Sequence, residues 1–430
     1  MQIAIVGTGV AGLVTAHALH RDHDITLFEA DDRLGGHVHT VDVEVDGVVH
    51  SVDTGFIVYN ERNYPGFVTL LDELGVETQP TEMSFSVSDR ARNIEYNGSS
   101  INTLFAQRRN VVNPGFIRLL TEIARFNRAA RTLVPDGHAA AAATRLPSAD
   151  SDPDPDESLA EFVDRGGYSA DFIERFLVPF GASIWSADPE TFTRFPAQTY
   201  ARFMHNHGLL SFTGRPQWRT VTGGARRYVD ALVAPFTDRI RLSSPVLQIG
   251  TDGRGPKVEI VTRHGIERFD RVVVATHSDQ ALRMLRDPTP TERSVLGAIG
   301  YQPNVATLHT DERMLPATPR ARASWNYTLD PGQRGSTVTY WMNRLQAIES
   351  TRPLLVTLNR RAAIADTEVL ADLEYDHPVF DLNAIAAQRR REEIQGHRGV
   401  YFAGAYWGYG FHEDGVQSGL EVAAAITATS

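Results

Sequence analysis

The first thirty residues combine a glycine-rich turn with the strands, helix and acidic residue of a dinucleotide-binding unit. Residues 3–6 (Ile-Ala-Ile-Val) read as a short buried strand, and Gly7, Gly9 and Gly12 follow in G-x-G-x-x-G spacing. Apolar residues then recur at helical intervals, and a second strand ends at Glu29, which lies 22 residues after the first glycine. A lone glycine triad is weak evidence, but this order of elements predicts a Rossmann-like α/β fold.

Each position of the motif has a physical task. Gly7 permits the tight turn, Gly9 lets the backbone approach a pyrophosphate, and Gly12 allows the helix to pack closely on the strand. The N-terminus of the helix favours the phosphate charge. Glu29 can accept hydrogen bonds from both ribose hydroxyls, and its charge disfavours a 2′-phosphate. The predicted cofactor contacts here are Gly7, Gly9, Val10, Ala11, Gly12, Glu29 and Ala30.

A second glycine pair follows directly, because residues 33–37 read Arg-Leu-Gly-Gly-His. A second close approach of the backbone indicates a large dinucleotide. At this point the chain resembles the FAD-dependent amine-oxidase superfamily, whose members carry a Glu at the end of the second strand and then an R-x-G-G-R-like segment. The resemblance implies FAD as the cofactor, with contacts from Arg33, Gly35, Gly36 and His37. His37 stands where the family usually has a second Arg.

Three further segments resemble parts of the same cofactor site. Asp53-Thr54-Gly55-Phe56 is similar to the family's D-x-G segment beside the flavin. In the superfamily, the residue equivalent to Val246 meets the adenine through its backbone, and an Ala-Thr pair after a buried strand lies along the dinucleotide. The resemblance therefore adds these predicted contacts: Thr54, Gly55, Phe56, Val246, Ala275 and Thr276.

The segment after the last predicted strand resembles the motif that closes the family's cofactor domain. There a strand-end glycine, here Gly404, meets the ribityl phosphate. A Gly-Val pair, here Gly415-Val416, opens a helix whose N-terminus faces the flavin pyrimidine carbonyl and stabilises negative charge on the reduced flavin. Many relatives have Asp or Glu where this chain has Ala405, and Asp414 is the candidate to replace that acid.

The whole run of residues 404–415, Gly-Ala-Tyr-Trp-Gly-Tyr-Gly-Phe-His-Glu-Asp-Gly, is also similar to one bacterial branch of the superfamily. Genes of this branch are associated with cyclopropane-fatty-acid-synthase-like methyltransferases, and a similar module is fused to such a methyltransferase in plants. The branch implies a lipid-acyl substrate and a methyltransferase partner.

The candidate catalytic residues come from the same C-terminal run. His412 stands beside Glu413 and Asp414. Because neighbouring acids can raise the pKa of a histidine, we predict that His412 acts as an acid or base. A hydrogen bond to the flavin and a purely structural role are the alternatives. Tyr406 and Tyr409 are the other candidates, within an aromatic wall at the flavin face that suits an apolar substrate or an aromatic sandwich. Ordinary packing under the flavin is the alternative for each of them.

Lysine and cysteine usage narrows the chemistry. The chain has no Cys, which excludes disulfides, thiolate metal sites, a Cys nucleophile and a cysteinyl link to a cofactor. Its one lysine, Lys257, falls in a predicted hairpin tip, whereas many amine oxidases hold a water near the flavin with a lysine. No metal site is predicted, because His37-x-His39 and His205-x-His207 lack further ligands at suitable spacing.

The remaining pattern predicts two discontinuous domains. A Rossmann-like FAD-binding domain of the amine-oxidase type takes residues 1–80, 220–290 and 395–430, and an α+β substrate domain takes residues 81–219 and 291–394. Residues 139–157, rich in Ala, Pro and Asp, are expected to form a flexible loop because they cannot build a core.

One stretch, from Asn102 to Val134, is predicted to be helical with an interruption near Asn113-Pro114-Gly115. Its apolar face comprises Phe116, Leu119, Leu120, Ile123 and Phe126, and its arginines lie mostly off that face. The first interpretation is an amphipathic helix packed on its own domain. The second is a helix whose apolar face lies on lipid while its arginines meet anionic headgroups.

Charge and hydropathy restrict the binding partners and the cellular location that we expect. The chain has 42 Lys+Arg and 53 Asp+Glu, a formal net charge of −11, which argues against a nucleic-acid-binding protein. No apolar run approaches the roughly 20 residues that cross a bilayer, and no signal peptide is seen. We therefore expect a cytoplasmic protein, with the lipid-bound alternative placing it at the inner face of the membrane.

These observations predict an FAD-dependent oxidoreductase that transfers hydride between flavin N5 and a carbon of a hydrophobic, fatty-acyl-type substrate. One alternative is a flavin amine or amino-acid oxidase. Another is a non-catalytic flavoprotein partner of a lipid methyltransferase.

Overall fold

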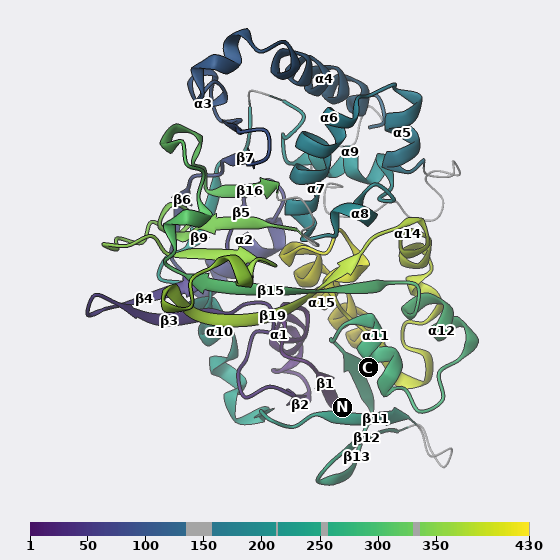
Figure 1. Cartoon of the computed structure of the whole chain (residues 1–430). Coiled ribbons are helices and arrows are strands. Elements are labelled where there is room, and N and C mark those ends of the chain that lie inside the picture. Colours follow the sequence, from purple (N-terminus) through teal and green to yellow (C-terminus); the bar gives the residue numbers. More distant parts are fainter. Residues whose placement is uncertain (135–156, 212–213, 251–256, 330–335, 430) are drawn as a thin grey trace.

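The computed structural model describes residues 1–134, 157–211, 214–250, 257–329 and 336–429 (Figure 1). All but the last residue of the expected loop at 139–157 lie outside the described residues. Within the described part of the chain, no helix has both the length and the apolar character of a membrane span.

A five-stranded parallel sheet holds the N-terminal glycine motif, in the order β10-β2-β1-β14-β20. The strands are β1 (Gln2–Val6), β2 (Asp24–Phe28), β10 (Ile240–Arg241), β14 (Arg271–Val274) and β20 (Val400–Phe402). Every pairing in this sheet is parallel. The structure therefore confirms the Rossmann-like α/β fold, assembled from segments hundreds of residues apart.

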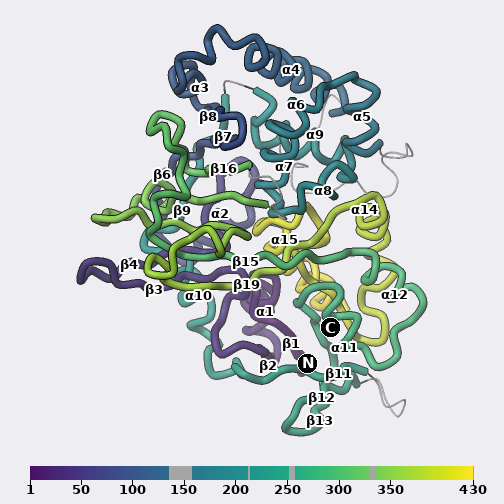
Figure 2. The backbone as a smooth tube through the Cα atoms, viewed as in Figure 1, coloured from purple at the N-terminus to yellow at the C-terminus, as the bar shows by residue number. Residues whose placement is uncertain are grey.

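Both faces of this sheet are buried, which explains its almost wholly apolar strands. Ile3 and Ile5 face a core shared with α1 (Val10–Leu19), α2 (Pro65–Leu74), α10 (Arg226–Val233) and α15 (His412–Thr427). Ala4 and Val6 face a second core, which continues toward the helical end of the molecule. Both ends of the chain are drawn toward the parallel-sheet end of the molecule (Figures 1 and 2).

A seven-stranded mixed sheet lies beside the parallel sheet, in the order β19-β15-β18-β17-β16-β7-β8. Its long outer pair, β15 (Gly300–His309) and β19 (Val369–Val379), runs antiparallel along most of its length. The other strands are β7 (Phe85–Asp89), β8 (Ile94–Asn97), β16 (Trp325–Leu329), β17 (Val338–Trp341) and β18 (Leu355–Leu358).

Three smaller sheets complete the strands. The hairpin of β3 (Thr40–Val45) and β4 (Val48–Asp53) turns at Asp46-Gly47, as predicted, with both residues at positive φ. Antiparallel β5 (Tyr59–Asn60), β9 (Trp218–Val221) and β6 (Thr78–Thr81) form the second sheet. Antiparallel β11 (Val246–Gly250), β12 (Val258–Thr262) and β13 (Gly265–Phe269) form the third.

A helical layer caps the end of the molecule farthest from the parallel sheet (Figure 1). It contains α3 (Ile101–Leu104), α4 (Pro114–Arg131), α5 (Leu159–Arg165), α6 (Ala170–Phe172), α7 (Val178–Trp185), α8 (Pro189–Phe192) and α9 (Ala197–Asn206). The remaining helices are α11 (Ser278–Met284), α12 (Pro290–Leu296), α13 (Met342–Leu345) and α14 (Leu382–Arg389).

Helix α4 decides between the two interpretations of its apolar face. The side chain of Asn113 caps the helix by accepting hydrogen bonds from the amides of Gly115 and Phe116, which explains the predicted interruption. Phe116, Leu119, Ile123 and Phe126 are buried in the core, and Leu120 packs against it. The packed-helix interpretation is confirmed, and the idea that this face lies on lipid is wrong.

Candidate active site

The glycine triad of the β1–α1 turn divides into two packing glycines and one open glycine. A Cβ on Gly7, which has φ +99°, would lie 2.8 Å from the carbonyl oxygen of Ala275. A Cβ on Gly12 would lie 2.1 Å from the carbonyl oxygen of Gly7, so only glycine fits. A Cβ on Gly9 would meet nothing within 4 Å. Gly9 therefore faces open space at the N-terminus of α1, where a pyrophosphate is favoured.

The second glycine pair lies directly against the first motif. The amide of Gly35 donates to the carbonyl of Thr8 over 3.1 Å, and Gly35 forms a parallel bridge with Gly9. A Cβ on Gly36 would lie 3.3 Å from the Cα atom of Gly9. Arg33 holds this turn through a 2.8 Å bond from its Nη1 to the carbonyl of Gly36. The structure thus brings both predicted backbone approaches together.

Glu29 ends β2 at the edge of the same space. Its Oε2 accepts from the Thr8 amide over 2.9 Å and from the Thr8 hydroxyl, and its Oε1 accepts from the Asp31 amide over 3.0 Å. These bonds fix the carboxylate, and further lone pairs stay available for a ligand. Ala30, the next residue, is exposed.

The remaining predicted contacts lie on three other segments of the chain. Ala275 and Thr276 follow β14, and Gly7 packs on both of them. The Ser244 amide donates to the carbonyl of Glu29 over 2.7 Å, which brings the chain leading into Val246 beside Glu29. On the third segment, the Gly404 amide donates to the Ser418 hydroxyl over 3.0 Å, and Ala405 begins a short 3-10 turn.

The D-x-G segment, residues 53–55, connects several parts of the chain through buried contacts. The buried carboxylate of Asp53 accepts from the Thr40 hydroxyl, the Ala225 amide over 3.0 Å and the Gln346 side chain over 2.9 Å. Burial raises the pKa of Asp53 to about 7. A Cβ on Gly55 would lie 2.0 Å from the carbonyl oxygen of His37, so this segment packs tightly on the second glycine pair.

Helix α15 departs from the expectation that it opens at Gly415-Val416. It begins at His412, so Gly415 is its fourth residue. A Cβ on Gly415 would lie 2.5 Å from Cγ1 of Val10, and Val416 is buried. Gly415 therefore serves the close approach of α15 to α1, and its predicted contact with the cofactor stays a prediction.

His412 does not have the surroundings of an acid–base group. Its ring stacks on Phe56 with centroids 3.8 Å apart, and its Nε2 lies 2.9 Å from the Tyr228 hydroxyl. Burial lowers the pKa of His412 to about 3, so the expectation that neighbouring acids raise it is wrong. This pKa leaves the imidazole neutral at physiological pH.

The two acids beside His412, Glu413 and Asp414, bind backbone amides of other residues. The carboxylate of Glu413 accepts from the amides of Gly66 and Phe67 at the start of α2, each over 2.8 Å. Asp414 accepts from the Phe411 amide over 2.8 Å and caps its own helix. Burial raises the pKa of Asp414 to about 8. Asp414 therefore braces the loop before α15, and its predicted compensation for Ala405 stays a prediction.

Tyr406 and Tyr409 are buried in the loop between β20 and α15. Gln388 holds this loop by donating 2.7 Å hydrogen bonds to the carbonyls of Tyr406 and Gly408, and Trp185 Nε1 donates to the Tyr409 carbonyl over 3.0 Å. Neither tyrosine hydroxyl has a hydrogen-bond partner of good geometry among the described residues. The aromatic wall is therefore present, with two buried hydroxyls inside it.

Arg202 of α9 is a buried cation beside this wall. It is 6% exposed, its Nε atom has no hydrogen-bond partner, and its head interacts with the Tyr409 hydroxyl. Within the described parts of the chain, no carboxylate forms an ion pair with it. Arg175 is equally buried, yet it lies 3.3 Å from Asp89 and 3.4 Å from Asp171. Sequence patterns alone gave no signal for Arg202.

A cluster of imidazoles that the sequence did not predict surrounds His37. The ring of His37 lies 5.7 Å from His277, 5.4 Å from His377 and 5.2 Å from Tyr375 between centroids. Burial, together with the neighbouring His377 and His277, lowers the pKa of His37 to about 3. Burial likewise lowers the pKa of His377 to about 4. His277 directly follows Ala275-Thr276, which is the signal that could have identified it.

Strand β19 connects this cluster to the rest of the site. The Tyr375 hydroxyl lies 2.7 Å from the hydroxyl of Thr54 and 3.1 Å from Nδ1 of His39. Nδ1 of His377 lies 3.0 Å from the side-chain nitrogen of Asn304 on β15. In the described ranges, no group of three or more His, Asp or Glu side chains is arranged to hold a metal ion.

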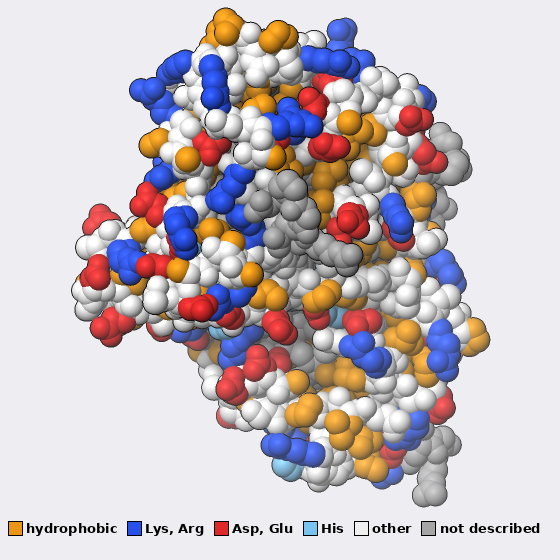
Figure 3. All heavy atoms as spheres, viewed as in Figure 1, with side chains coloured by type: hydrophobic (Ala, Val, Ile, Leu, Met, Phe, Trp, Pro, Cys, Tyr) orange, Lys and Arg blue, Asp and Glu red, His pale blue; other side chains and the backbone are white. Residues whose placement is uncertain are grey.

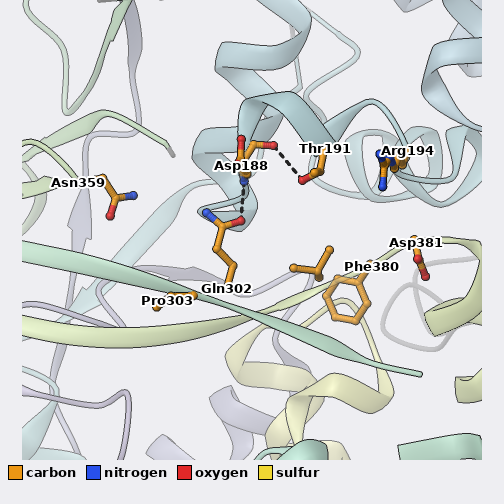
Figure 4. Close-up of a pocket in the computed structure, with 9 residues that line it drawn as sticks. Asp188, Thr191, Arg194, Gln302, Pro303, Asn359, Phe380 and Asp381 are labelled. Atoms are coloured by element: carbon orange, nitrogen blue, oxygen red, sulfur yellow. Dashed lines mark hydrogen bonds between the residues drawn. The ribbon is translucent and has the colours of Figure 1, made fainter. Parts of the chain in front are cut away.

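A cavity of about 480 Å³ opens between α8 and the β15–β19 pair (Figure 4). Gln302 crosses toward α8, where its side-chain oxygen accepts from the Asp188 amide over 2.7 Å. None of the residues lining the cavity is a predicted site residue. One of them, Asn359, donates to Asn304 over 2.7 Å, and so a polar chain joins the cavity wall to His377.

Comparisons with known proteins agree with this geometry. A family model described as flavin containing amine oxidoreductase matches residues 10–427. Protoporphyrinogen oxidase 2 of Arabidopsis thaliana is 28% identical over 191 residues, which are 44% of this chain and 34% of that protein. The chain thus matches about a third of the length of this curated relative.

Solved structures of the same fold span the whole chain at low identity. Cyclohexylamine oxidase from Brevibacterium oxydans IH-35A has a TM-score of 0.70 and 17% identity, covering 100% of this chain and 99% of that one. A CLA-producing fatty acid isomerase from P. acnes has a TM-score of 0.69 and 16% identity, covering 99% and 98%. At these identities the likeness shows the fold alone.

Proposed function

Because the chain belongs to the flavin-containing amine oxidoreductase family, we propose that this FAD-dependent oxidoreductase acts on an apolar substrate with an anionic head, such as a fatty acid. Among the structural neighbours are a cyclohexylamine oxidase and a fatty acid isomerase. The fold alone therefore does not indicate which class of substrate this chain takes. The choice rests on residues of this chain.

The residues at the β1–α1 turn fit FAD. Gly9 leaves open the space that a Cβ would fill, and Gly36 brings a second stretch of backbone to the same place. Glu29 presents a fixed carboxylate for the ribose, and Ala275 and Thr276 border the turn. When bound there, FAD supplies a flavin ring that accepts or returns hydride.

The observation that carries the substrate class is the buried guanidinium of Arg202, whose Nε has no hydrogen-bond partner and which forms no ion pair with a carboxylate of the described residues. An uncompensated buried charge is costly, and it is compensated when a ligand brings the opposite charge. A carboxylate can accept two parallel hydrogen bonds from a guanidinium, and the Tyr409 hydroxyl beside it can donate a third. A protonated alkylamine would instead be repelled by the same cation.

The position of the lysine argues against amine oxidation of the lysine-assisted type. Nζ of Lys257 lies 3.5 Å from Asp270 and 3.3 Å from Gln2, at the edge of β1. The chain has no other lysine. A water held by lysine near the flavin therefore has no counterpart here.

His37, beside the cofactor turn, is neutral and presents one ring nitrogen that can accept a hydrogen bond. Nε2 of His37 lies 3.1 Å from the Asp376 carbonyl, so this nitrogen donates and Nδ1 carries the free lone pair. Because the pKa of His37 is about 3, its imidazole is neutral and only weakly basic at neutral pH, so Nδ1 can accept a hydrogen bond from a ligand. Tyr406, Trp407 and Tyr409 are buried, so their rings exclude water from this part of the molecule.

The test is anaerobic mixing of the FAD-loaded protein with oleate, methyl oleate and octylamine. The proposal expects oleate to change the flavin absorbance and to give a product with an added double bond, detected by mass spectrometry, or with a shifted double bond, detected by NMR. Reduction by octylamine alone would support the amine-oxidase alternative and overturn the proposal. A methyltransferase partner stays a separate prediction, tested by co-purification of the two proteins.

A further inference from the structure

One end of the molecule exposes a group of large apolar side chains. Ile101 is 80% exposed, Val112 is 82% exposed, and Val111 and Ile117 are 52% and 41% exposed. They belong to α3, to the 3-10 turn Arg108–Val112 and to the first turn of α4. We call residues 101–118 the tip. Figure 3 shows hydrophobic groups at this end of the molecule with arginines beside them.

The exposure of these side chains is not explained by a poorly packed α4, because the other side of this helix is well buried. The opposite side of α4 already buries Phe116 and Leu119, which are 1% and 2% exposed. Asn113 caps α4 and fixes the turn that leaves Val112 and Ile117 on the outside. Exposed apolar groups that gather in one place usually mark an interaction surface.

The charge around the tip is opposite to that of the whole chain. Residues 99–134 hold six arginines and one acid, which gives 6 − 1 = +5, whereas the chain carries −11. All six arginines are exposed, and the acid, Glu122, is buried. The arginines are Arg108, Arg109, Arg118, Arg125, Arg128 and Arg131.

The two arginines within the apolar group are not neutralised by ion pairs that the structure records. Arg108 donates to the carbonyls of Asn102 and Phe105 over 3.2 and 2.9 Å, and Arg109 donates to the carbonyl of Asn93. These bonds hold the side chains in place and leave their charge uncompensated.

We propose that the tip docks on an anionic lipid surface, with Ile101, Val111, Val112 and Ile117 entering the interface and the arginines of the tip, Arg108, Arg109 and Arg118, meeting the headgroups. Shallow apolar insertion and basic side chains are the two contributions that hold a peripheral protein on such a surface. The inference does not depend on the substrate, because it rests on exposure and charge at the tip. It replaces the buried face of α4 as the lipid contact.

The matched control is the β3–β4 hairpin. Val48 and Val49 are 55% and 65% exposed there, but Glu44 and Asp46 stand beside them. This hairpin is apolar at its surface without a basic rim. Its variants therefore report the effect of adding charge to an exposed valine pair away from the tip.

The experiment is co-sedimentation of the FAD-loaded full chain with vesicles of phosphatidylglycerol or phosphatidylcholine, at low and high salt. The wild type is expected to sediment with phosphatidylglycerol vesicles at low salt and to be released by salt. Ile101→Glu with Val112→Glu is expected to abolish sedimentation, and Arg108→Glu with Arg109→Glu to weaken it by about fivefold or more per charge. Val48→Glu with Val49→Glu should bind like the wild type.

Flavin content and the melting temperature establish that each variant is folded. Absence of sedimentation by the wild type at low salt would overturn the proposal, as would equal binding to both lipids. Unchanged binding of the Ile101→Glu, Val112→Glu variant would place the contact elsewhere. Dimerisation that the same variant abolishes, without lipid binding by the wild type, would assign the tip to a second copy of the chain.

Discussion

Arg202 and Arg175 are equally buried arginines in opposite electrostatic situations. Arg175 has two carboxylates within 3.4 Å, whereas Arg202 has the Tyr409 hydroxyl. We expect Arg202→Met to leave the free energy of unfolding unchanged or higher, because it removes an uncompensated buried charge. We expect Arg175→Met to cost about 3–5 kcal/mol, because it strands buried Asp89. Urea unfolding of both variants checks this, and a large loss for Arg202→Met would mean that the protein itself compensates the charge.

Glu29 offers a second test at the scale of one residue. Its carboxylate is fixed by Thr8 and Asp31 at the edge of the open turn. Glu29→Ala should weaken FAD binding by about 1.5–3 kcal/mol, the contribution of hydrogen bonds to a charged acceptor. Asp31→Ala, at an exposed neighbour, is the control and should retain FAD. Equilibrium dialysis gives both affinities, and equal FAD affinity in the Glu29 variant and the wild type would place the ribose contact elsewhere.

At the scale of elements, the contact of α1 with α15 joins the two ends of the chain. A Cβ on Gly419 would lie 2.6 Å from the carbonyl oxygen of Ala11, which is backbone and cannot move aside. Gly419→Val should therefore separate the helices and cost about 1–3 kcal/mol, in the range of other overpacking changes. Leu420→Val, at a neighbouring side chain that is 42% exposed, should cost much less. Chemical denaturation compares them, and equal stability of the two variants would contradict the packing account.

The same elements show how far sequence reasoning reaches. The glycine turns, the Asp46-Gly47 hairpin and the start of α4 depend on local chemistry, and the structure confirms them. The histidine cluster joins His37 to His377, and the wall joins Arg202 to Tyr409, so both depend on segments far apart in the chain. The predicted rise in the pKa of His412 is wrong because the carboxylates of its sequence neighbours, Glu413 and Asp414, bind backbone amides of Gly66 and Phe411.

At the scale of the whole molecule, buried titratable groups should give stability a maximum near neutral pH. His37, His377 and His412 have pKa values of about 3, 4 and 3, so their contribution is complete above pH 6.5 and is lost as pH falls toward 4. Asp53 and Asp414 have raised pKa values, about 7 and 8. Their contribution is present at low pH and is lost as pH rises through those values.

This account predicts a specific effect of Asp414→Asn. The amide keeps a carbonyl oxygen that can accept from the Phe411 amide, but it does not ionise. The variant should therefore lose less stability than the wild type as pH rises from about 4 to about 8, the interval between the unfolded and folded pKa values of Asp414, since each unit of pKa shift corresponds to about 1.4 kcal/mol. Urea unfolding at several pH values measures both slopes. Identical slopes over this interval would show that Asp414 does not control this loss.

The β1–α1 turn lies toward one end of the molecule, α3 and α4 lie at the other end, and α9 and the start of α15 lie between them (Figure 1). Buried Arg202 belongs to α9, and buried Tyr409 shortly precedes α15 in the chain. The central claim is that the substrate has an apolar chain and an anionic head group, and that Arg202 binds the head group. Titration of the oxidised FAD-loaded protein with oleate and with methyl oleate, followed by the flavin spectrum, tests this claim most directly. We predict that the wild type binds oleate at least tenfold more tightly than the uncharged ester, and that Arg202→Met removes this difference. Equal binding of acid and ester by the wild type would contradict the account.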